Sequence, residues 1–234
     1  MATYHVLKDW MEVWALFIPI IFLCFRKKQP HTLKPVIAYV FIALYLNYLI
    51  DVVFQFQDIC NFPIWFRTNT YIYHINSIVR FFIFAYFFIK LDQPFLYWIK
   101  RIIPVLYLGF VIINFNFHEK FINYWFEDGY VKSDMSNLLL SVEAALLLIY
   151  CLQYYIYRML EDRTETQKPP DFWIVTGLSV YVAISFPIYL YYDRLKVDYI
   201  YFAINIWKVH NVSFIIFCIF MAKAFNTRPM PSKK

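Results

Sequence analysis

Four ionisable side chains interrupt segments that are otherwise apolar enough to lie in a membrane. They are two acids and two bases, namely Asp51, Arg80, Glu143 and Lys208. A charged group near the bilayer centre costs about 2.5 to 3.5 kcal/mol on insertion scales, and it usually faces a protein partner or a cavity. The balance of signs therefore predicts that these groups neutralise one another inside a helix bundle. The chemistry open to such a cluster is ion pairing, ligand binding or proton transfer.

Uncharged polar residues recur at helical spacing beside these charges. Tyr73, Asn76 and Arg80 stand at positions i, i+3 and i+7, which places them on one face of a helix. Asn47 precedes Asp51 by four residues and Asn205 precedes Lys208 by three, whereas Ser136, Glu143 and Tyr150 recur every seven residues. We therefore predict one intramembrane ligand-binding site formed by the following residues: Asn47, Asp51, Tyr73, Asn76, Arg80, Glu143, Asn205 and Lys208.

The predicted site lies in the outer half of the membrane, with two cations as its floor. Arg80 and Lys208 would attract an anionic group of a ligand, and Asp51 and Glu143 would balance the two cations when the site is empty. A purely structural role stays open, because buried ion pairs often do no more than fix the register of packed helices.

The elements that must position these residues are membrane-spanning helices. The chain has 234 residues, of which 62% are hydrophobic and only 16% charged, and its mean hydropathy is +0.50. A soluble domain carries about 25% charge. The sequence predicts an all-α, polytopic membrane protein that forms one domain over residues 1–234. Its seven transmembrane helices are expected at about 11–25, 35–55, 69–90, 97–116, 136–158, 171–192 and 198–224.

The basic residues predict how the chain is oriented. Most of the 22 Lys and Arg residues fall in the connections 26–34, 90–101 and 158–168 and in the tail 223–234. Cytoplasmic segments carry such an excess, so we expect the N terminus outside and the C terminus in the cytoplasm. This arrangement also requires an odd number of crossings. The net charge of +6 is thereby explained by the membrane, and no nucleic-acid partner is predicted.

The sequence contains no motif that is typical of a metal or cofactor site. The two intramembrane histidines, His74 and His210, have no histidine or acid four residues further along, so no metal site is predicted. A retinal Schiff base on Lys208 is disfavoured because a cation, Arg80, stands where its counter-ion is expected. Neither HExxH nor GxSxG occurs. We predict no cofactor and no catalytic residues.

Three stretches carry a family resemblance. They are "YIYHINSIVRFFIFAYFFIKL", "PPDFWIVTGLSVY" and "KVHNVSFIIFCIFMAKAF", in the third, sixth and seventh predicted helices. Their layout resembles small bacterial seven-helix membrane proteins and the membrane sensor regions of histidine kinases. The resemblance implies a multi-pass protein of the bacterial inner membrane that senses through the bilayer. It assigns no binding residues, and we expect this chain to differ from the sensor kinases in having no attached output domain.

The leading functional hypothesis is a receptor-like sensor or accessory signalling protein. It would bind a small or lipid-derived ligand in the outer-half pocket and pass a helix shift to a cytoplasmic or membrane partner. An oligomeric channel or ion-translocating subunit is the first alternative, and a membrane-embedded lipid-modifying enzyme is the second. The abundance of Phe and Tyr, 26 and 21 copies, favours binding over conduction, because bulky rings leave little room for a water column.

Overall fold

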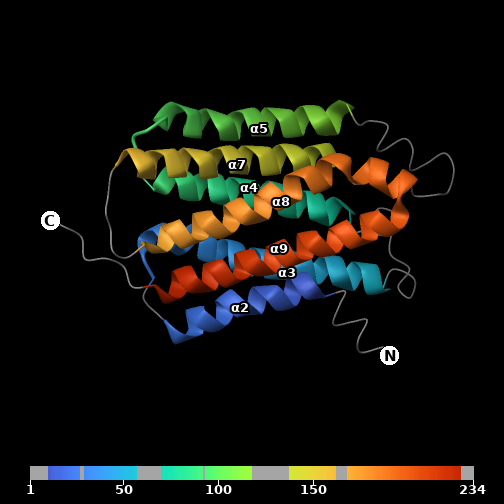
Figure 1. Cartoon of the computed structure of the whole chain (residues 1–234), viewed down its shortest axis with the longest axis horizontal. Coiled ribbons are helices and arrows are strands. Elements are labelled where there is room, and N and C mark those ends of the chain that lie inside the picture. Colours follow the sequence, from blue (N-terminus) through green and yellow to red (C-terminus); the bar gives the residue numbers. More distant parts are fainter. Residues whose placement is uncertain are drawn as a thin grey trace.

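The structure is a bundle of α-helices lying side by side (Figure 1). It is a computed structural model, and it describes residues 10–26, 29–56, 70–91, 93–117, 137–161 and 168–227. Within these residues there are seven α-helices, a short 3₁₀ turn at His31–Leu33, and no strand. The helices are α2 (Met11–Phe25), α3 (Lys34–Phe56), α4 (Thr70–Lys90), α5 (Tyr97–Phe117), α7 (Asn137–Leu160), α8 (Pro170–Asp198) and α9 (Ile200–Asn226).

Six of these helices, all except α2, are long and apolar enough to cross a membrane. The exception has 15 residues, which corresponds to about 22 Å of helix, whereas a hydrocarbon core is about 30 Å thick. The helix boundaries agree with the predicted spans to within two residues, except at the end of α8. That helix continues to Asp198 instead of ending at 192. Hydropathy marks where the apolar segment stops, and a helix can continue beyond that point into water.

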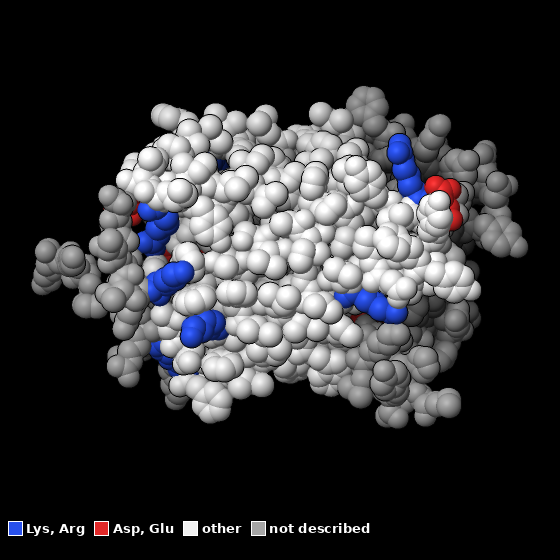
Figure 2. Space-filling model, viewed as in Figure 1, with Lys and Arg blue, Asp and Glu red and all other residues white. Residues whose placement is uncertain are grey.

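Consecutive helices run in opposite directions, so α2 and α9, the first and last described helices, both begin at one end of the bundle and finish at the other (Figure 1). We call the end where α2, α4, α7 and α9 begin the N-side, and the opposite end the C-side. On the face drawn in Figure 2, charged side chains gather toward the two ends and leave the central part uncharged. This distribution is the one expected of a protein whose middle is surrounded by lipid.

The core of the C-side half consists mainly of aromatic rings. Tyr39, Phe84, Phe87, Phe88 and Phe217 are each no more than 2% exposed. Phe84 packs edge-on against Tyr39 at 5.0 Å between ring centroids and lies 5.7 Å from Phe217. The core of the N-side half is different, because it contains most of the buried polar side chains.

The two helices of the last hairpin, α8 and α9, make the most extensive contact in the bundle. Gly177 makes this possible, since a Cβ atom at this position would lie 2.5 Å from the Cβ atom of Phe220. The short helix α2 packs mainly against α9 and also touches α3. At the C-side, the Gln29 side chain donates a hydrogen bond of 3.0 Å to the Phe225 carbonyl. The segment that follows α2 is thus tied to the end of α9.

Candidate functional site

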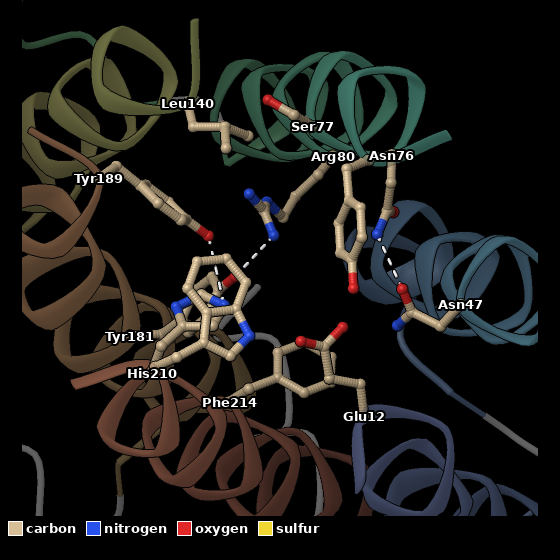
Figure 3. Close-up of a pocket in the computed structure, with 12 residues that line it drawn as sticks. Glu12, Asn47, Asn76, Ser77, Arg80, Leu140, Tyr181, Tyr189, His210 and Phe214 are labelled. Carbon is tan, nitrogen blue, oxygen red and sulfur yellow. Dashed lines mark hydrogen bonds between the residues drawn. The ribbon is translucent and has the colours of Figure 1, made fainter. Parts of the chain in front are cut away.

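A small enclosed cavity lies among the helices of the N-side half (Figure 3). Its volume is about 20 Å³, which is close to the space that one water molecule needs. Ligand pockets for small organic molecules measure about 300 to 1,000 Å³. The side chains around it come from α2, α3, α4, α7, α8 and α9: Glu12, Asn47, Tyr73, Asn76, Ser77, Arg80, Leu140, Tyr181, Tyr189, Trp207, His210 and Phe214.

A buried ion pair stands beside this cavity and joins α4 to α7. Arg80 Nε donates to Glu143 Oε1 at 2.6 Å, and Arg80 Nη2 donates to Glu143 Oε2 at 2.7 Å. The two side chains are 8% and 0% exposed. Ser77 donates a further hydrogen bond to Glu143, and Arg80 Nη1 donates to the Tyr181 hydroxyl at 2.6 Å. This two-pronged geometry is the strongest arrangement available to an arginine and a carboxylate.

Because of these contacts, Arg80 has little capacity left for a ligand. Nε, Nη1 and Nη2 all donate to protein groups, and its charge is balanced by Glu143. The prediction that Arg80 is neutralised by a carboxylate from another helix is confirmed. The idea that it forms the floor of an anion site is not supported by this geometry.

Two asparagines connect α3 to α4 on another wall of the cavity. Asn76 Nδ2 donates to Asn47 Oδ1 at 3.0 Å, and both residues are buried. The Oδ1 atom of Asn76 is buried and accepts no hydrogen bond from the residues that the structure describes. Tyr73 also lines the cavity, as its spacing from Asn76 and Arg80 predicts. Asp51, one turn beyond Asn47, is half-buried and does not line the cavity.

His210 forms a second buried cluster with α8 that the sequence analysis did not include in the site. Its Nδ1 atom lies 2.9 Å from Ser185 Oγ, and its Nε2 atom lies 3.3 Å from the Tyr189 hydroxyl. His210 is 4% exposed. A signal for this cluster exists in the sequence, because Tyr181, Ser185 and Tyr189 stand at i, i+4 and i+8 on one helix face.

Glu12 is the acidic residue that the sequence analysis missed. In Figure 1, α2 begins part-way along the bundle, short of the N-side ends of α3 and α9, so the first turn of α2 lies at the depth of the cavity. Figure 3 shows the Glu12 carboxylate turned toward the other cavity residues. No described residue forms a hydrogen bond or an ion pair with it. The sequence did contain a signal for this residue, because Glu12 is an acid placed one residue inside the apolar run 11–25.

Lys208 and Asn205 lie outside the site. Lys208 Nζ donates to Asn205 Oδ1 at 2.7 Å, and both side chains are exposed on α9. The prediction that Lys208 is held in the bundle interior by Glu143 or Asp51 is wrong. The buried face of α9 is instead formed by residues such as His210, Phe214 and Phe217. An exposed lysine near a helix end extends its ammonium group toward the membrane surface, and the bond to Asn205 points one turn toward that end.

Comparison of the chain with protein-family models, with curated proteins and with solved structures finds no match.

Proposed function

We propose that this chain is a multi-pass integral membrane protein that acts as a receptor-like sensor in a bacterial inner membrane. Its N-side faces outward and its C-side faces the cytoplasm. The described cations support this orientation: at the C-side end lie Arg26, Lys34, Lys90, Lys100, Arg101, Arg158, Lys168 and Lys223. At the N-side end the exposed described cations are Arg194 and, closer to the membrane, Lys208. Such an asymmetry is typical of a cytoplasmic C-side.

In this proposal α2 is a seventh, incomplete crossing. Its contacts with α9 and α3, and the hydrogen bond from Gln29 to Phe225, fix it in the bundle. Its N-side end stops at the depth of the cavity, so Glu12 reaches the interior from the end of a short helix.

The observation that carries the proposal is the charge of Glu12, which no described residue neutralises. The positive charge of Arg80 is already balanced by Glu143, so an ionised Glu12 leaves the described residues around the cavity with an excess of one negative charge. A charge held away from bulk water without a counter-charge is costly, and neutralisation relieves that cost. The occupant of a cavity of about 20 Å³ must also be no larger than a water molecule. The sensed species is therefore a proton or a small monovalent cation, and an anionic organic ligand does not fit.

The C-side half favours sensing over transport of this species through the protomer. Beyond Arg80, the centre of the bundle is filled by rings, including those of Phe84 and Phe88. Rings in such close contact leave little room for a column of water in this part of the bundle. A lipid-modifying reaction at the His210 cluster is equally disfavoured, because Ser185 is 1% exposed and a lipid cannot reach it.

A change in the charge of Glu12 has a direct mechanical consequence in this arrangement. Glu12 is at one end of α2, and the segment after its other end bonds to the last turn of α9 at the C-side. Neutralising Glu12 removes the electrostatic cost of a buried negative charge at the N-side end of α2. This changes how the helix packs against α9. A shift there reaches the C-side end, where a cytoplasmic or membrane partner would detect it.

The test compares the wild type with Glu12→Gln in lipid nanodiscs. Thermal unfolding is followed across a pH series, and at fixed pH with sodium chloride replaced by choline chloride. The wild-type midpoint should depend on pH, on sodium or on both, and the pH and sodium series tell the two species apart. Glu12→Gln, which imitates the neutral side chain, should be more stable and should lose that dependence.

Glu161→Gln is the matched control, because this acid lies at the C-side and bonds to Tyr157 outside the cavity. It should keep the wild-type dependence on pH and sodium. The proposal fails if Glu12→Gln retains the same dependence, or if the wild type shows none.

A further inference from the structure

A second, much larger concavity lies on the surface of the α8–α9 hairpin, near its N-side end. It is an open groove of about 420 Å³, within the size range of small-molecule sites. Its lining is almost entirely apolar and comes from both helices: Pro187, Ile188, Tyr191, Arg194, Leu195, Phe202 and Ile206. It shares no lining residue with the buried cavity.

The groove has a structural cause in the sequence of α8. In the C-side half, Gly177 allows α8 and α9 to approach so closely that a Cβ atom would collide with Phe220. Ten residues later, Pro187 lies inside α8, and a proline in a helix interior removes one backbone hydrogen bond and bends the helix. The groove begins at Pro187. The hairpin is therefore tightly packed at one end and hollowed at the other.

The groove straddles the level at which the hydrocarbon region ends. The apolar segment of α8 ends at Tyr192, and that of α9 begins at Tyr201. Leu195 lies beyond this boundary, and Ile188 and Ile206 lie within it. An apolar concavity at headgroup depth is exposed to water and polar groups along part of its length, so an occupant with a hydrocarbon chain would be stabilised there.

Arg194 is the charged residue of the lining, and it is exposed. It lies just outside the apolar segment of α8, where the polar end of an inserted amphiphile would come to lie. A guanidinium group there matches a carboxylate in charge and in hydrogen-bonding geometry. Arg194 is the cation among the described lining residues, and a single positive charge matches an occupant that carries one negative charge.

We propose that this groove binds a long-chain fatty acid, with its hydrocarbon chain along Ile188, Tyr191 and Ile206 and its carboxylate at Arg194. The site is independent of Glu12 and of the sensing of small cations. A fatty acid that binds here contacts both helices of the hairpin beyond the proline, so its binding restrains how α8 and α9 pack against each other there.

The test uses stearic acid carrying a nitroxide near the end of its chain, added to the full-length protein in nanodiscs made of an uncharged phospholipid. Electron paramagnetic resonance separates the immobilised spin label from the label in free lipid, and a titration gives the affinity. The methyl ester of the same probe and a phosphatidylglycerol with the same label are run in parallel. The acid should bind more tightly than either of the other two probes.

Two substitutions separate the contributions of the chain and the headgroup. Ile206→Trp fills the groove and should weaken binding of the acid by about tenfold or more, as overpacking at a filled site costs 1 to 3 kcal/mol. Arg194→Gln should weaken binding by about threefold and should abolish the preference for the acid over its methyl ester. Arg194→Lys should keep part of that preference.

Val209→Trp is the matched control for added bulk, because Val209 is 50% exposed on the same helix and does not line the groove. It should bind the probe as the wild type does. Arg194 is exposed, so its variants test the headgroup contact even if Ile206→Trp fails to fold, which thermal unfolding will show. The proposal is overturned if no immobilised component appears, if Ile206→Trp folds and binds like Val209→Trp, or if the labelled phospholipid binds best.

Discussion

The two halves of the bundle are held together by different interactions. In the N-side half, Arg80 and Glu143 form a bidentate ion pair, and amides and hydroxyls bridge neighbouring helices. In the C-side half, Phe88 stacks on Tyr150 with centroids 5.1 Å apart and an interplanar angle of 7°. Helices in lipid gain little from the hydrophobic effect, so they associate through close packing and polar contacts. In this protein the buried ion pair lies in the N-side half, whereas close ring packing dominates the core of the C-side half and the ion pair of Arg158 with Asp171 lies near the C-side end.

The largest expected effect comes from breaking the buried ion pair. Arg80→Met leaves Glu143 buried without its cation, and Glu143→Leu leaves Arg80 without its anion. Each should lower the free energy of unfolding by about 3 to 5 kcal/mol. The double variant should recover most of this loss, because replacing a whole buried pair by apolar groups is often neutral. Chemical unfolding in mixed micelles measures all four proteins.

Arg101→Met provides the control for removal of an arginine. Arg101 is exposed and lies over the Tyr97 ring, 4.2 Å from its centroid, so its loss should cost less than about 1 kcal/mol. If the double variant proves as unstable as the sum of the two single variants, Arg80 and Glu143 are not coupled, and the N-side half is not organised by their charges.

The stability of the C-side half should depend on the volume of its buried side chains. A substitution that keeps most of the volume should cost less than one that removes most of the side chain. Phe84 is fully buried between Tyr39, Phe87 and Phe217. Phe84→Ala should cost about 3 kcal/mol, because it opens a cavity among rings that cannot collapse. Phe84→Leu should cost less than about 1.5 kcal/mol. Equal losses for the two variants in the same unfolding experiment would show that the ring itself, and not its volume, holds this half together.

A smaller effect is expected where the two helices of the last hairpin approach each other. Gly177→Ala places a methyl group against Phe220, which must move, and the cost should be about 1 to 3 kcal/mol. Gly109→Ala is the matched control on α5, since nothing lies within 4 Å of the added carbon. That change should be neutral or stabilise by up to about 1 kcal/mol. Similar midpoints of thermal unfolding for the two variants would show that α8 and α9 can separate at no cost.

The sequence contains enough information to predict the helices and part of the polar site. Long apolar runs locate six spans, and their ends match the helices closely except at Asp198. The spacing of Tyr73, Asn76 and Arg80 correctly predicts a common face, because helical periodicity relates residues within one helix. The pairing of Arg80 with an acid follows from the cost of leaving either alone in the membrane.

The remaining features depend on how the helices are placed relative to one another. Glu12 reaches the cavity because α2 begins part-way along its neighbours, and no property of residues 11–25 alone encodes that offset. On α9, the stripe with Asn205 and Lys208 and the face with Trp207 and His210 are both plausible interior faces. In a soluble protein, hydrophobicity would distinguish them. In a membrane, lipid and core are both apolar, and the contacts of α9 with α8 and α2 decide which face is buried.

The smallest effect is predicted for Lys208→Met, the substitution that most directly tests this difference between the faces of α9. Lys208 is exposed, and its hydrogen bond to Asn205 is an exposed contact within one helix. Its loss should change the free energy of unfolding by no more than about 0.5 kcal/mol, and the midpoint of thermal unfolding should keep its dependence on pH or sodium. His210→Phe on the opposite face leaves Ser185 and Tyr189 without their partner and should cost about 1 to 3 kcal/mol. A large loss of stability for Lys208→Met with little loss for His210→Phe would mean that α9 presents the opposite face to the bundle. Lys208, and not His210, would then belong to the buried polar contacts of the N-side half.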